Sequence, residues 1–299
     1  MPQSAFSSAD LLPALNRIAD SLERLAPPKA DATILDTPDI DAFLWQGTVG
    51  TLLPVTKVQS VPLSYLCGIQ KQCETVLDNT KHFAAGRQAN NVMLWGARGM
   101  GKSSLVKSCV LDVNRTQREK GLSPLALIEI PRDELSTLPQ LLALLRQSDR
   151  RVILFCDDLS FESQDADYKS LKSVLDGGIA GRPDNVVVYA TSNRKHLMPR
   201  DMIENEASSS INPGEAIEEK VSLSDRFGLW IGLYSASQDD YLTIVKTYAH
   251  AIALPIDDKT LEEKALRWSL TRGSRSGRVA SQFITALSAE LDATKEPSA

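Results

Sequence analysis

The feature that most constrains the fold of this chain is the stretch 91–104, where a short apolar run leads into a glycine-rich loop. The loop matches the pattern G-x-x-x-x-G-K-[ST] from Gly96 to Ser103. Glycines let the backbone wrap its N–H groups around a polyphosphate, and a helix that begins at Lys102 directs its positive end at the same anion. The pattern predicts a phosphate-binding loop rather than a turn that only caps a helix. The expected contacts come from Gly96, Ala97, Arg98, Gly99, Met100, Gly101, Lys102, Ser103 and Ser104.

Two side chains of this loop have distinct expected roles. The Lys102 ammonium group would reach the β and γ phosphates of a nucleotide. The Ser103 hydroxyl would ligate Mg²⁺, which prefers oxygen ligands. The loop therefore predicts a nucleotide site that holds a magnesium ion.

Helix and strand patterns alternate regularly from Cys67 onward, which predicts an α/β fold with a parallel sheet and helices on both faces. A helix is expected at 70–83, and five strands at 91–95, 125–130, 152–156, 186–190 and 229–233. Each strand is a short and nearly continuous apolar run, as is typical of strands buried on both faces. After residue 238 the pattern becomes helical, with helices expected at 239–252, 258–271 and 278–291.

Polar side chains follow two of the expected strands. Asp157 and Asp158 come directly after 152–156, and Asn193 follows 186–190. Ligands of an open parallel sheet sit beyond the carboxyl ends of its strands, so these groups should lie beside the bound phosphates. Asp157 would hold the metal ion through water, Asp158 would polarise the attacking water, and Asn193 would orient it. Taken alone, the two acids could cap a helix and the asparagine could belong to a turn.

The N-terminal part of the chain is less informative. A helix with one apolar stripe is expected at 9–26, from the spacing of Leu11, Leu15, Ile18, Leu22 and Leu25. The stripe must be covered, either by the rest of the chain or by a partner helix or a second copy. A linker follows, and residues 42–65 are expected to form only short extended pieces. Farther along, the composition of 201–220 predicts a mobile loop.

Composition limits the partners of the protein. The chain has 299 residues, a net charge of −5 and 42% hydrophobic residues, so a sizeable core is expected in about two domains. The acidic balance makes nucleic acid an unlikely partner. No apolar run is long enough for a membrane span, and the first twenty residues do not resemble a signal peptide, so we expect a cytoplasmic protein. The four cysteines lack metal-ligand spacing.

The order of these features resembles that of the AAA+ ATPases over residues 63–290. The resemblance implies that ATP is the nucleotide and that Gly68 and Ile69 lie on its adenine side. It also implies that Asn193 is the sensor-one residue and that Arg226 is an arginine finger. Such a finger acts on the adjacent subunit, so a homo-oligomer is expected.

The resemblance further implies a sensor-two arginine at the start of the last helix. Arg278, which is followed by Val279 and Ala280, fits the usual pattern, and Arg275 is the alternative. On this basis three domains are expected: 1–62 with the N-terminal helix, 63–236 with the nucleotide-binding sheet, and 237–299 as a helical lid. ATP would bind between the sheet and the lid.

Four segments resemble a narrower group more closely. The sequences NNVMLWGARG at 90–99, FCDDLSFE at 155–162, YATSNR at 189–194 and LSDRFGLW at 223–230 are similar to the uncharacterised bacterial AAA+ family known as domain of unknown function 815. That similarity implies a bacterial cytoplasmic ATPase and gives no substrate.

Two departures from the usual AAA+ pattern bear on function. Most members have Glu where this chain has Asp158, so turnover could be slow, and Glu162 is a less favoured alternative base. The segment 131–137 after the second expected strand has no aromatic residue, which disfavours an unfoldase that threads polypeptide. Three classes remain: an ATPase that remodels or loads an unidentified protein partner, a slow nucleotide switch, and a nucleic-acid-associated loader.

Overall fold

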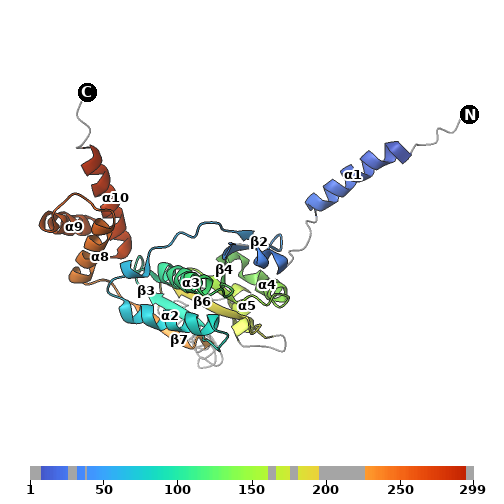
Figure 1. The fold of residues 1–299 in the computed structure, drawn as a ribbon, viewed down its shortest axis with the longest axis horizontal. Coiled ribbons are helices and arrows are strands. Elements are labelled where there is room, and N and C mark those ends of the chain that lie inside the picture. The colour runs from blue at the N-terminus through green and yellow to red at the C-terminus, as the bar shows by residue number, and fades with distance from the viewer. Residues whose placement is uncertain are drawn as a thin grey trace, which may run out of the picture.

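The computed structural model of the protein describes residues 8–25, 32–37, 39–160, 166–175, 181–194 and 226–293. Its centre is a seven-stranded sheet in the order β2-β1-β4-β5-β6-β3-β7 (Figure 1). Five of these strands run parallel at the expected positions, which confirms the α/β fold class: β3 (Val92–Gly96), β4 (Ala126–Glu129), β5 (Val152–Cys156), β6 (Val186–Ser192) and β7 (Leu229–Leu233).

The expected count of five strands was wrong, because two further strands extend the sheet beyond β4. β1 (Ala42–Gln46) pairs in parallel with β4, and β2 (Thr51–Pro54) pairs with β1 in the antiparallel direction. Phe43, Trp45 and Leu52 are buried and join the core. Only one residue of the edge strand β2 is buried, so this stretch lacks the continuous apolar run that reveals a central strand.

Helices cover both faces of the sheet, and strand side chains alternate between the two cores they create. α2 (Gln70–Ala84) and α3 (Lys102–Glu119) pack on one face, and α4 (Leu138–Leu145) and α5 (Ala166–Leu175) contribute to the core on the other. On β5, Ile153 and Phe155 face α3, whereas Val152 and Leu154 face the opposite core. All five residues of β5 are buried, as expected for a central parallel strand.

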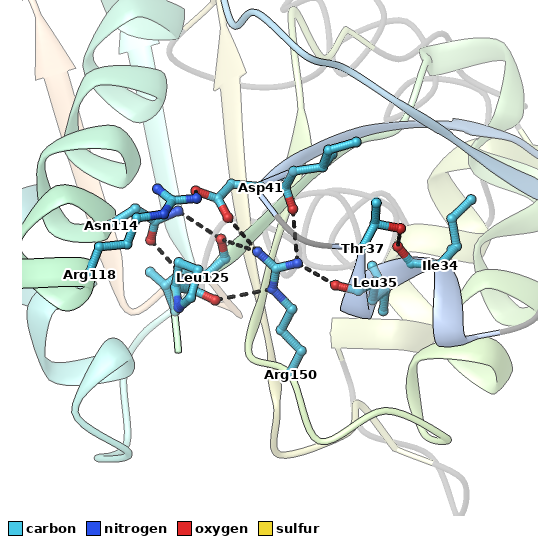
Figure 2. Close-up of polar contacts among 10 residues, drawn as sticks. Ile34, Leu35, Thr37, Asp41, Asn114, Arg118, Leu125 and Arg150 are labelled. Carbon is cyan, nitrogen blue, oxygen red and sulfur yellow. Dashed lines mark hydrogen bonds and ion pairs between the residues drawn. The ribbon is translucent and has the colours of Figure 1, made fainter. Parts of the chain in front are cut away.

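A buried ion-pair network ties β1 to the rest of the domain (Figure 2). Arg150, just before β5, donates from Nη2 to Asp41 Oδ1 at 2.6 Å and from Nη1 to the Ile40 carbonyl at 3.0 Å. Arg118 of α3 lies 2.5 Å from the other oxygen of Asp41. Burial lowers the pKa of Arg150, and the Asp41 carboxylate opposes that shift. One carboxylate thus joins the start of β1 to α3 and to the turn before β5.

Three helices after β7 form a separate small core. α8 (Gln238–Ala251), α9 (Asp258–Arg272) and α10 (Gly277–Ala293) begin and end within two residues of their expected positions. Tyr241, Ala265 and Phe283 are among their shared buried residues. The Ser237 hydroxyl accepts from the Asp240 amide at 3.0 Å, and the Asp240 carboxylate accepts from the Ser237 amide at 3.1 Å. This capping box fixes the beginning of α8 directly after the sheet.

α1 (Ser8–Leu25) forms as expected and lies apart from the sheet and the lid in Figure 1. Of its apolar side chains that the structure describes, Leu12, Leu15 and Ile18 are each more than half exposed. The described chain therefore does not cover this part of the stripe. No described helix meets the length and hydrophobicity that a membrane span requires.

Candidate nucleotide site

The phosphate-binding loop joins β3 to α3 at the carboxyl edge of the sheet. Gly96 has φ of 131°, and a Cβ atom there would lie 1.9 Å from the Leu233 carbonyl oxygen of β7. Gly101, with φ of 86°, precedes the first residue of α3 in the left-handed conformation. Both positions require glycine, the first because of the close approach of β7 and the second because of its positive φ. The sequence pattern is thus explained by local geometry.

Lys102 begins α3 and turns its side chain back along the loop. Its Nζ donates to the carbonyl oxygens of Gly96 and Ala97, each at 2.9 Å, and to Asn193 Oδ1 at 3.0 Å. The residue is only 7% exposed, and burial lowers its pKa, although the nearby Asp158 carboxylate opposes the shift. An ammonium group that is partly desolvated gains strongly from an anionic ligand.

Ser103, Asp157 and Thr191 converge from three elements. Asp157 Oδ1 accepts from the Ser103 hydroxyl at 2.6 Å and from the Thr191 hydroxyl at 2.5 Å. The sequence analysis does not single out Thr191. It follows Ala190 on β6, and because successive strand residues point to opposite faces of a sheet, its side chain lies on the face opposite to that of the buried Ala190. Serine and carboxylate oxygens are the ligand types that Mg²⁺ prefers, so this donor set fits the ion.

The Asp158 carboxylate has a different partner from the Asp157 carboxylate, although the Thr191 hydroxyl contacts both residues. The Asp158 backbone N–H donates to Thr191 Oγ1 at 2.8 Å, and its carboxylate accepts a hydrogen bond from the Asn193 side-chain amide. Its φ is 51°, a left-handed conformation that aspartate tolerates better than most residues. The two adjacent carboxylates therefore have separate partners. Glu162, the alternative base, lies outside the described residues.

A cavity of about 580 Å³ opens between the loop and the helices of the lid. Arg278 of α10 lines it, and the Arg278 amide donates to the Gly99 carbonyl at 3.2 Å. Arg275, the alternative sensor-two residue, does not line this cavity and contacts Gln238 Oε1 at 3.4 Å. The geometry brings Arg278, and not Arg275, to this cavity.

Most of the expected site residues share this cavity, and several do not. Its lining includes Ile69, Arg98, Gly99, Met100, Gly101, Lys102, Ser103, Ser104, Asp157, Asp158, Asn193 and Arg278. Gly68, Gly96 and Ala97 are absent from the lining. Gly68 has φ of 77° and packs against Asp240 of α8, so it shapes the turn beside the cavity.

An aromatic pair at the far side of the cavity was not foreseen from the sequence. Tyr65 and Tyr248 of α8 pack edge to face with ring centroids 5.6 Å apart, and both line the cavity. Leu66 and Ile244 add apolar surface there. This end of the cavity can receive a flat, apolar group such as a base, whereas the loop end is polar. Nothing in the sequence alone shows which face of α8 turns toward the loop.

Arg226 does not line the cavity of its own chain. It precedes β7 at the amino end of the strand, whereas Leu233 at the other end pairs with Gly96. The strand itself, Leu229–Leu233, spans on the order of 13 Å, and Arg226 precedes it. The structure thus does not bring Arg226 to the other expected site residues. The loop expected at 201–220 lies outside the described residues.

Comparison with known proteins gives a family and several weak structural similarities. Residues 38–291 match the model of a family described as "Protein of unknown function (DUF815)". No match is found among curated proteins. The match confirms the similarity to domain of unknown function 815 that four segments of the sequence indicate, and its description names no fold or activity.

Three solved structures illustrate the similarity. The RuvB Holliday junction branch migration motor of Thermotoga maritima is 15% identical with a TM-score of 0.42, covering 75% of this chain and 71% of that one. The Aeropyrum pernix ORC1 protein in complex with DNA is 13% identical, with a TM-score of 0.46 and coverage of 75% and 65%. Domain III of the T. maritima replication initiation protein DnaA is 16% identical, with a TM-score of 0.46 and coverage of 77% and 88%. None of these assigns a substrate or partner to this chain.

Proposed function

The chain belongs to the family described as "Protein of unknown function (DUF815)", and we propose that it is a magnesium-dependent ATPase of the AAA+ type. One observation carries the proposal. Lys102, Ser103 and Asp157 meet in a single cavity that is polar at the phosphate-binding loop and apolar beside Tyr248. A nucleotide triphosphate has the same division between phosphates and base.

The loop would bind the phosphates through backbone N–H groups and the positive end of α3. Lys102 would exchange its contacts with two loop carbonyls for contacts with phosphate oxygens. Ser103 would hold the magnesium ion directly and Asp157 through water, and the ion would neutralise phosphate charge. Arg278 would contact the nucleotide from the lid, with Arg275 outside that contact.

Asp158 and Asn193 would act on the attacking water. The Asp158 carboxylate would accept a proton from it, and Asn193 would hold that carboxylate in place. Since aspartate is one methylene shorter than the usual glutamate, the water would sit farther from its base and turnover would be slow. The shorter side chain of Asp158 therefore also favours the second candidate, a slow nucleotide switch.

The output of the cycle would be remodelling or assembly of a protein partner. The η3 turn (Arg132–Thr137) that follows β4 has no aromatic side chain, which disfavours threading of polypeptide. The net charge of −5 gives no support to nucleic acid as a partner. We place the nucleotide-binding domain from β1 rather than from residue 63, because β1 and β2 belong to its sheet, and keep the lid at 237–299.

Substitution of the loop lysine tests the proposal. Lys102→Ala should lose tight binding of Mg·ATP by calorimetry, because no other ammonium group lines the cavity among the described residues. Lys120→Ala is the matched control, since Lys120 is exposed at the opposite end of the same helix. Equal ATP affinity in the two variants would contradict the assignment.

A further inference from the structure

A second cavity, of about 630 Å³, borders the phosphate-binding loop. It shares Arg98 and Met100 with the nucleotide cavity and is lined by the connection from β7 to α8 and by the turn between α9 and α10. Its volume is within the range of small-molecule sites. None of the expected functions accounts for it.

The charged residues that line this second cavity are all basic. Arg98 and Arg275 line it together with four serines, and none of its lining residues is acidic. Within the described residues neither arginine has a carboxylate partner, and Arg275 contacts only the neutral Gln238 side chain, at 3.4 Å. In a chain with a net charge of −5, such a cavity attracts anions.

Helix ends add to this preference. The residues that line the cavity before α8 and before α10 lie at the amino ends of both helices, which carry partial positive charge. The buried Ser276 hydroxyl caps α10 by accepting from the Val279 amide at 3.3 Å, which leaves its own proton for a ligand. The carboxyl end of α9, at Gly273, carries partial negative charge and disfavours an anion in the cavity. Binding of an anion therefore depends on the two arginines.

The cavity also has apolar surface beside these donors. Met100 is buried at one side, and Leu270 of α9 is 74% exposed at the rim. A bare inorganic anion would fill only a small part of about 630 Å³. We propose that this cavity binds a small organic anion, with a phosphate or carboxylate group on Arg98 and Arg275 and an apolar part against Met100 and Leu270. The proposal does not depend on ATP hydrolysis.

Calorimetric titration of the full chain with phenyl phosphate, benzoate and inorganic phosphate tests this site. Phenyl phosphate or benzoate should bind, and the tighter of the two identifies the anionic group. Arg275→Gln should weaken that binding at least tenfold, because a charge-assisted bidentate contact is lost. Leu270→Asn should weaken binding of the aromatic probe and leave the binding of inorganic phosphate unchanged.

Two controls separate this site from the nucleotide cavity and from general charge. Lys102→Ala should bind the probe as the natural chain does. Arg272→Gln should also bind normally, because Arg272 packs over the Trp268 ring with its guanidinium carbon 4.9 Å from the centroid and lines neither cavity. The proposal is overturned if neither aromatic anion binds, or if Lys102→Ala loses binding that Arg275→Gln retains.

Discussion

At the scale of single residues, Asp158 combines a chemical role with a conformational one. A left-handed φ of 51° costs aspartate and asparagine less than glutamate, because their short side chains bond locally to the backbone. The residue that looks weaker for catalysis is therefore the better one for this backbone. Asn193 completes the arrangement by donating to its carboxylate.

Asp158→Asn should keep ATP binding and lose most hydrolysis, since the shape and the backbone conformation are retained while the proton acceptor is removed. Turnover and calorimetry on the same preparation measure both effects. Asp157→Asn should instead weaken the magnesium-dependent part of binding, because it removes the negative charge that would hold the ion beside Ser103. Normal turnover in Asp158→Asn together with an inactive Glu162→Gln would show that the roles are assigned to the wrong carboxylates.

Cys156, which directly precedes Asp157, gives a pH dependence of stability. The thiol is fully buried at the end of β5, and burial raises its pKa from 9.0 to about 12. Above pH 9 the unfolded chain releases this proton while the folded chain keeps it, so stability falls as pH rises toward 12. The loss is roughly 1.4 kcal/mol per pH unit for one such group. Urea unfolding at pH 8 to 10.5 should show a shallower decline for Cys156→Ala than for the natural chain, and parallel declines would refute this cause.

At the scale of elements, β1 depends on the buried pair of Asp41 and Arg150. The two side chains are 9% and 8% exposed, so removing the carboxylate charge leaves a buried guanidinium without its counter-ion. We expect Asp41→Asn to lower the free energy of unfolding by about 3 kcal/mol in urea titrations.

Asp112→Asn provides the comparison for that loss. Asp112 pairs with Arg115 on the surface of α3, where the arginine side chain is 70% exposed. This substitution should change stability by no more than about 0.5 kcal/mol. Similar losses in the two variants would mean that burial of the Asp41 network contributes little.

The elements also differ in how far the sequence predicts them. The sequence predicts β5 and β6 because their residues are buried on both faces of the sheet and therefore include continuous apolar runs. The sequence predicts only a short extended piece at β2, because an edge strand with one buried residue and a terminal proline lacks a continuous apolar run. The residues of the phosphate-binding loop follow a local pattern, whereas Tyr248 and Thr191 enter the cavity only through packing of distant elements. Sequence periodicity does not encode that packing.

At the scale of the whole molecule, the two ends of the sheet carry different parts of the proposed active site. The phosphate-binding loop lies at the carboxyl end of β3, and Arg226 lies before the amino end of the neighbouring β7. Arg226 and Lys102 of one chain therefore lie at opposite ends of parallel strands that span on the order of 13 Å. A second copy would have to bring its Arg226 to the cavity, and the exposed apolar residues of α1 offer one further surface for association.

Mixing of two inactive variants tests this division. Arg226→Ala should keep ATP binding and lose turnover, because a guanidinium that neutralises the transferring phosphoryl group is worth roughly 10³ to 10⁵ in rate. Lys102→Ala should lose binding at its own cavity yet still donate Arg226. A mixture of the two should therefore recover part of the activity, and the specific activity of the natural chain should rise with protein concentration. Activity that is independent of concentration, with no recovery in the mixture, would mean that Arg226 acts within its own chain or only in folding, and each subunit would then have to complete its active site alone.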